Sequence, residues 1–198
     1  MSRRPASPAA DIARIALFAA LIVVLGAVVV PLSGGVPVTG QTLGVMLAGV
    51  VLGARRAPFA VLLVLLLAAL GLPVLAGGRG GLGVFVGPSA GYLLGWVAGV
   101  VVIGLLVGRG RIRAWRVALA SLLGGIGVVY LFGVPVQALV LGTPLGATAL
   151  SSLVFLPGDL LKVALTTVLA VALARAYPRA FGPRTAAAER PVAETVTP

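Results

Sequence analysis

Cysteine and histidine are both missing from this 198-residue chain, and only four of its residues are acidic. The missing cysteines exclude disulfides and thiol nucleophiles, and the missing histidines exclude a Ser-His-Asp triad and Cys/His metal sites. Charged residues make up 10% of the chain, whereas soluble domains carry about 25%. Because 60% of the residues are hydrophobic, a folded chain could not cover its surface with polar groups. The composition therefore predicts an integral membrane protein, for which lipid is the solvent.

Long apolar runs divide the chain into six predicted membrane spans. Their approximate ranges are 12–31, 38–54, 57–74, 88–107, 117–134 and 151–175. The first run follows several arginines, as a signal peptide would, but it is longer than the apolar part of a signal peptide and further spans follow it. We therefore interpret it as a retained span, and the predicted fold class is an all-α polytopic membrane protein with six transmembrane helices.

Basic residues lie almost entirely on one side of these spans. Of the 15 basic residues, 13 fall in segments on the same side of the membrane as the N-terminus. Arg79 falls on the other side, and Lys162 falls inside the last span. The positive-inside rule then predicts that both termini are cytoplasmic. The arginine clusters lie between apolar runs, so we expect them to contact lipid head groups and not nucleic acid. Residues 1–175 are predicted to form one transmembrane substrate-binding domain, and the proline-rich 176–198 a disordered cytoplasmic tail.

The three predicted outer loops are rich in glycine, proline and small apolar residues. They are 32–41, 73–87 and 134–150. Backbone without helical hydrogen bonds cannot face lipid, so we expect these loops to fold over the helix ends and cover a cavity. Plain hairpin connections are the alternative. The glycines of 77–83 are not followed by a Lys-Ser/Thr pair, so any ATP would have to be bound by another subunit.

An acid and the only lysine lie three residues apart in the last span. Asp159 is the only acid inside the apolar body of the chain, and its spacing from Lys162 places both side chains on one helix face. Ionisable groups inside a membrane are unfavourable and mark candidate functional sites. A structural salt bridge between helices is the alternative. Pro157 precedes the pair and favours a helix start there, which places the pair in the outer part of the membrane.

Two further polar groups are predicted at the same outer level. Thr39 and Gln41 lie at the start of the second span, and Ser89 and Tyr92 at the start of the fourth. Their hydroxyl and amide groups can form hydrogen bonds with a small polar ligand. Helix capping, interhelical bonding and interfacial anchoring are the alternatives for these residue types. These residues predict a binding protein that is not an enzyme and has no metal or cofactor of its own.

Four blocks of sequence occur together in an order that closely resembles the BioY family. They are VPVTGQTL at 36–43, GLPV at 71–74, GPSAGYL at 87–93 and FLPGDLLK at 155–162. The resemblance extends over about 13–173. It implies a six-helix fold like that of the S components of energy-coupling factor (ECF) transporters, with an outward-facing biotin pocket that Asp159 and Lys162 contact. Arg79 departs from this pattern, because a polar uncharged side chain is expected in its loop.

The resemblance also implies partners. BioY proteins are biotin-binding S components, which act with a transmembrane T component and a pair of cytoplasmic ATPases. Ala16 and Ala20 match the small-residue pattern on the first helix that forms the surface for these partners. ATP would be bound only by the partner subunits, and biotin is the expected ligand.

The chemistry of biotin agrees with the candidate residues. Asp159 can accept hydrogen bonds from the two ureido N–H groups, and Lys162 can donate to the ureido oxygen or pair with the carboxylate. Gln41, Ser89 and Tyr92 can add neutral hydrogen bonds. Two alternatives remain for the function: an S component for another vitamin, such as thiamine or riboflavin, and a stand-alone transporter that uses Asp159 as a proton carrier.

Overall fold

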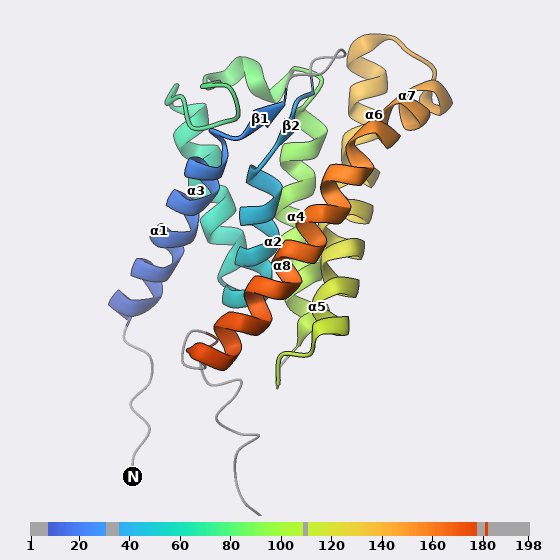
Figure 1. Cartoon of the computed structure of the whole chain (residues 1–198). Helices are drawn as coiled ribbons and strands as arrows, with labels where there is room; N and C mark the ends of the chain where they lie inside the picture. Colours follow the sequence, from blue (N-terminus) through green and yellow to red (C-terminus); the bar gives the residue numbers. More distant parts are fainter. Residues whose placement is uncertain (1–7, 31–35, 109–110, 178–180, 182–198) are drawn as a thin grey trace, which may run out of the picture.

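The computed structural model describes residues 8–30, 36–108, 111–177 and 181. Within these ranges the chain passes through the molecule six times as a helix (Figure 1). The passes are α1 (Pro8–Leu25), α2 (Gln41–Leu52), α3 (Ala57–Ala69), α4 (Ala90–Val107), a fifth built from α5 (Ala114–Ala120), the π-helix η2 (Ser121–Val128) and α6 (Val129–Leu141), and α8 (Leu156–Ala176). The predicted all-α fold of six helices is confirmed. The predicted tail falls mostly on residues outside the described ranges and stays a prediction.

Among the described residues, four helical segments are long and apolar enough to cross a membrane. They are Pro8–Leu25, Ala90–Val107, Ala114–Leu141 and Leu145–Ala176. In contrast, α2 and α3 have 12 and 13 residues, or about 18–20 Å of helix against a hydrocarbon core of about 30 Å. The predicted spans 38–54 and 57–74 are therefore longer than the helices that form. Because α2 packs among α1, α3, α4 and α8, the irregular backbone that precedes it can lie at membrane depth without facing lipid.

Glycines allow α4 to approach its neighbours closely. A β-carbon added at Gly95 would lie 2.8 Å from Val129 Cα in the fifth pass, and one added at Gly49 of α2 would lie 2.8 Å from Ile103 on α4. Both distances are shorter than real β-carbon contacts, so side chains larger than hydrogen are excluded there. Small residues at helix contacts are typical of membrane bundles, in which close packing holds helices together.

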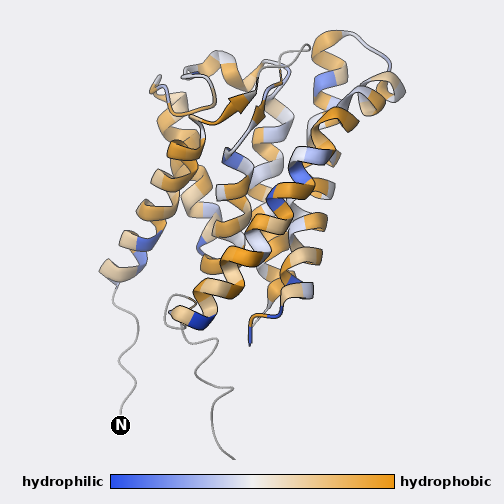
Figure 2. Ribbon diagram, in the orientation of Figure 1, coloured by the Kyte–Doolittle hydropathy of each residue, from blue (hydrophilic) through white to orange (hydrophobic). Residues whose placement is uncertain are grey.

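The outward faces of the helices are apolar (Figure 2). Large side chains such as Leu66 on α3, Leu105 on α4 and Leu169 on α8 are exposed. Hydrophilic residues gather instead near the helix ends, and the start of α1 and the end of α8 lie at the same end of the molecule. This distribution suits a protein surrounded by lipid.

The opposite end of the molecule is closed by irregular structure. Here β1 (Val29–Val30) pairs antiparallel with β2 (Val38–Thr39), and the 3-10 turn η1 (Leu82–Phe85) precedes α4. The first helix ends at Leu25, earlier than the predicted 31, because the chain turns after it to form β1. We call this end the outer end, after the sequence prediction.

The prediction of a loop at 134–150 is wrong. The helix α6 continues through Pro135 to Leu141, and α7 (Leu145–Ser152) and the 3-10 turn η3 (Leu153–Phe155) follow. A proline disfavours helical geometry in the residue before it, which is why the sequence suggested an end there. Helices packed in a bundle tolerate an internal proline, because neighbouring groups satisfy the backbone. The predicted helix start near Pro157 is confirmed, since α8 begins at Leu156 with Pro157 in its first turn.

Candidate substrate-binding site

A cavity lies between the helices and the loops of the outer end. Its polar lining comes from β2, α2, α4, α6, α8 and two loops, and consists of Thr39, Gln41, Thr42, Arg79, Ser89, Tyr92, Tyr130, Asp159 and Lys162. Apolar side chains, among them Leu93, Trp96 and Phe155, form the rest of the wall. All six residues predicted to bind substrate therefore lie around one cavity.

The predicted pair on α8 lies in this cavity and is buried. Lys162 Nζ is 2.8 Å from Asp159 Oδ1 and also donates a hydrogen bond to Thr42 Oγ1 on α2, at 2.8 Å. The two residues are only 6% and 9% exposed. An ammonium has three N–H donors, so these two bonds leave one donor of Lys162 for a ligand.

Tyr130 completes the surroundings of the carboxylate, and the sequence analysis missed it. Its hydroxyl donates to Asp159 Oδ2 at 2.7 Å, so each oxygen of Asp159 accepts one hydrogen bond from the protein. Each carboxylate oxygen has a further lone pair that can accept a bond from a ligand. The available signal was a phenol in the middle of an apolar run, but nothing in the sequence paired it with Asp159.

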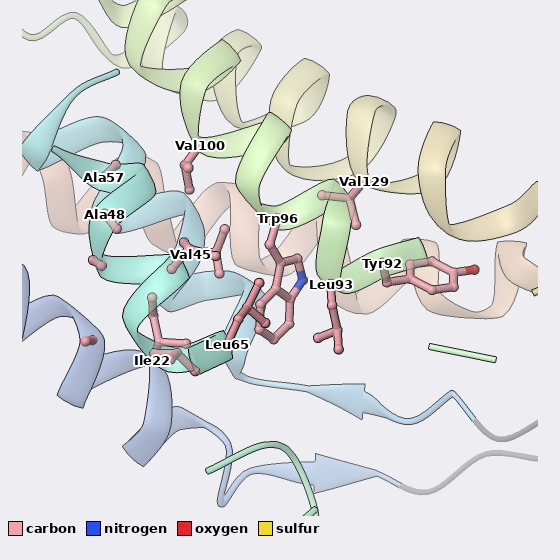
Figure 3. Close-up of a cluster of buried hydrophobic side chains, with 14 of the residues drawn as sticks. Ile22, Val45, Ala48, Ala57, Leu65, Tyr92, Leu93, Trp96, Val100 and Val129 are labelled. Atoms are coloured by element: carbon pink, nitrogen blue, oxygen red, sulfur yellow. The ribbon is translucent and has the colours of Figure 1, made fainter. Parts of the chain in front are cut away.

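Aromatic rings from three elements form one side of the site. Tyr92 packs edge-on against Tyr130 and Phe155, with ring centroids 6.1 and 6.4 Å apart. The hydroxyl of Tyr92 donates to Gln137 Oε1 at 2.7 Å and lies 3.3 Å from Ser152 Oγ. Figure 3 shows that Trp96 and Tyr92 both extend from α4, Trp96 towards Val45 and Tyr92 away from it, and all three belong to one buried cluster. These rings offer an apolar face to a ligand, and the bonds of Tyr92 fix its position.

Gln41 lines the cavity but its side chain also holds a loop in place. Its Nε2 donates to the carbonyl of Val74 at 3.0 Å, and its Oε1 accepts from the backbone N–H of Ala76 at 2.9 Å. The residue is 1% exposed. Its amide thus forms one donated and one accepted hydrogen bond with the loop backbone, as a paired strand does. The direct ligand contact predicted for Gln41 from the sequence stays a prediction.

Comparison with known proteins assigns the family. The model of the BioY family matches residues 1–179. This chain belongs to the BioY family. The "Biotin transporter BioY" of Rhizobium etli is 47% identical over 178 residues, which cover 85% of this chain and 95% of that protein. The protein of the same name from Rhodobacter capsulatus is 49% identical, over 86% of this chain and 96% of its own length.

A solved structure agrees with this assignment. The crystal structure of the S component for biotin from an ECF-type ABC transporter superposes with a TM-score of 0.82 and 31% sequence identity. The match covers 88% of this chain and 95% of that one. Family membership, inferred from four sequence blocks, is confirmed. The assignment is to a BioY transporter family and not to an enzyme.

The predicted partner surface of this BioY protein lies away from the cavity. Ala16 and Ala20 are both exposed and lie one turn apart on α1. Neither residue lines the cavity. Their position leaves them available to another subunit, which is what the sequence predicted for them, and that role stays a prediction.

Proposed function

We propose that this chain is the biotin-binding S component of an ECF-type transporter and that it takes up biotin from the outer end. The observation that carries this proposal is the buried Asp159–Lys162 pair, held by Tyr130 and Thr42 in the wall of the outer cavity. Relatives that are 44–49% identical to the chain are named as biotin transporters or probable biotin transporters. Both observations point to the same ligand.

The polar end of the cavity is suited to the ureido ring of biotin. Its N–H groups would donate to the remaining lone pairs of Asp159, and its carbonyl oxygen would accept the third N–H of Lys162. The apolar thiolane ring would pack against the aromatic wall. A buried site of this kind selects strongly, because an analogue that lacks one polar group leaves a buried partner unsatisfied.

The arrangement of Asp159 supports binding over proton transport. Its carboxylate already accepts bonds from an ammonium and a phenol, and both donors belong to the fixed wall of the cavity. A proton carrier would have to exchange protons with both faces of the membrane. Uptake by a stand-alone proton carrier would be abolished by an uncoupler in vesicles that lack ATPase subunits.

We further propose that both termini face the cytoplasm, where the arginine-rich ends of the helices meet anionic lipid. The cavity then opens to the outside. A T component and two ATPases would bind on the α1 side, through Ala16, Ala20 and neighbouring residues. Energy would come from ATP bound by those subunits.

Ligand titration of the purified protein tests the proposed function directly. Biotin should bind tightly, and dethiobiotin, which keeps the ureido ring and the carboxylate but lacks sulfur, more weakly. Thiamine and riboflavin should not compete. Preferential binding of either of these two vitamins would refute biotin as the ligand.

A further inference from the structure

The charges in the cavity wall do not balance. Asp159 carries one negative charge, whereas Lys162 and Arg79 carry one positive charge each, so the wall has a net charge of +1. Lys162 is paired with Asp159 at 2.8 Å. Among the described residues, no carboxylate lies within salt-bridge distance of Arg79. A partly buried charge without a counter-ion is unfavourable, so this wall is suited to a ligand with one negative charge.

The loop that carries Arg79 is built rigidly. Leu75 and Arg79 exchange two backbone hydrogen bonds across a tight turn, in which Gly77 and Gly78 adopt φ values of 72° and 71°. Other residues rarely adopt this left-handed conformation, so the turn depends on glycine. Gln41 holds the same loop through the backbone of Val74 and Ala76. The position of Arg79 is therefore set before any ligand binds.

The side chain of Arg79 is also oriented. Its Nε donates to the carbonyl of Ala76 at 3.1 Å, and the residue is half-buried. Among the described residues, its two terminal Nη groups have no hydrogen-bond partner. A guanidinium held by Nε presents these two groups as a planar fork, which matches the two oxygens of a carboxylate.

We propose that Arg79 binds the carboxylate of the ligand and makes this pocket select the free acid over its neutral esters and amides. This inference rests on the proposed function and refines it. The other cation of the wall, Lys162, is a poorer partner for the carboxylate, because a second carboxylate there would lie beside Asp159 and be repelled. The ligand is then oriented with its ureido ring at α8 and its acid group at the loop of residues 74–79.

Binding of biotin, biotin methyl ester and biotinamide to purified protein tests the inference. Wild-type protein should bind biotin about 10- to 100-fold more tightly than the two neutral compounds, as expected for a hydrogen-bonded charge pair. In Arg79→Gln, biotin should weaken by that factor while the neutral compounds bind as they do to wild type. Their retained binding shows that the pocket of the variant is folded.

Two further variants sharpen the test. Arg79→Lys keeps the positive charge but loses the two parallel N–H donors of the guanidinium, so this variant should retain a reduced preference for biotin over its ester and amide. Arg116→Gln removes an arginine at the opposite end, where it stacks on Trp115, and should leave the preference unchanged.

The possible outcomes separate the inference from the proposed function. Equal binding of biotin and its ester to wild type would overturn the inference but leave biotin as the ligand. So would an equal loss of all three ligands in Arg79→Gln, because a structural role would act on acid and ester alike. Binding of none of the three compounds to wild type would overturn both.

Discussion

The two ion pairs among the described residues lie at opposite ends of the molecule and in different surroundings. Asp159–Lys162 spans 2.8 Å, with side chains that are 9% and 11% exposed, in the wall of the outer cavity. Asp11–Arg56 spans 2.7 Å, with side chains that are 25% and 34% exposed, at the arginine-rich end. The distances are nearly equal, so distance does not distinguish a functional pair from a peripheral one. Burial and the additional partners, Tyr130 and Thr42, do.

The molecule can be divided into an inner half, which contains Asp11–Arg56, and an outer half, which contains Asp159–Lys162, and the two halves are built differently. The inner half consists of helices that pack through an apolar cluster that includes Met46, Ile103 and Val117. The outer half contains the strands, the turns and most of the buried polar side chains. Irregular backbone is tolerated at that end where its polar groups are paired, as between β1 and β2 and between Leu75 and Arg79. Stability is therefore expected to depend on both halves, and ligand binding on the outer half alone.

The largest effect is expected for Asp159→Ala. It removes the acceptor for the ureido ring and leaves Lys162 buried without its counter-ion, which destabilises proteins by about 3–5 kcal/mol. Biotin affinity should fall by at least about 100-fold in titrations, since two charge-assisted bonds are lost. Retained tight binding would refute the site assignment.

A double variant separates binding from folding at this site. Replacing both members of the pair, as Asp159→Leu with Lys162→Met, leaves no unpaired charge and should restore much of the thermal stability lost in Asp159→Ala. Biotin binding should not return. Recovery of binding along with stability would show that the pair has only a structural role.

Gly104→Ala, in the inner half, should lower stability but leave biotin affinity unchanged. A β-carbon at Gly104 would lie 2.6 Å from Ala54 Cα, so the variant should lose about 1–3 kcal/mol of stability through overpacking. Biotin affinity of the folded fraction should stay within about threefold of wild type, because neither Gly104 nor Ala54 lines the cavity. Gly146→Ala, where nothing lies within 4 Å, is the matched control and should not destabilise. A large affinity loss in Gly104→Ala would contradict the division into two halves.

A smaller effect is expected for Tyr130→Phe. The variant keeps the ring but removes the hydrogen bond to Asp159 Oδ2, which should weaken biotin binding about 10-fold. Tyr177→Phe, at the exposed end of α8, is the control and should bind as wild type does. Unchanged affinity in Tyr130→Phe would show that Asp159 does not need this partner.

The smallest effect is expected for Asp11→Asn. Because the pair with Arg56 is partly exposed, its loss should change the free energy of unfolding by less than about 1 kcal/mol, and less still at high salt. Biotin titration should give the wild-type affinity. A loss of binding comparable to that of Asp159→Ala would show that the two ends are coupled.

Rare residues made the ion pair on α8 predictable from the sequence. Asp159 and Lys162 stand out because ionisable groups are scarce in an apolar chain, and their spacing alone placed them on one helix face. The arginine clusters likewise marked the helix ends, so six passes could be counted without coordinates. The lengths of the helices were less predictable, because the apolar loops next to α2 and α3 have the same composition as a helix. Pro135 suggested the end of a helix, but α6 continues through it.

By itself, the sequence determined that lipid surrounds this protein, how many helical passes it has and which charged pair lies in its last helix, because hydropathy and charge act on each segment separately. Only the tertiary structure decided which groups meet that pair and which groups remain available. Tyr130 reaches Asp159 from 29 residues away, and Gln41 binds a loop 35 residues further on. Such contacts depend on how helices pack against one another, and packing is a property of the whole chain that no local pattern contains.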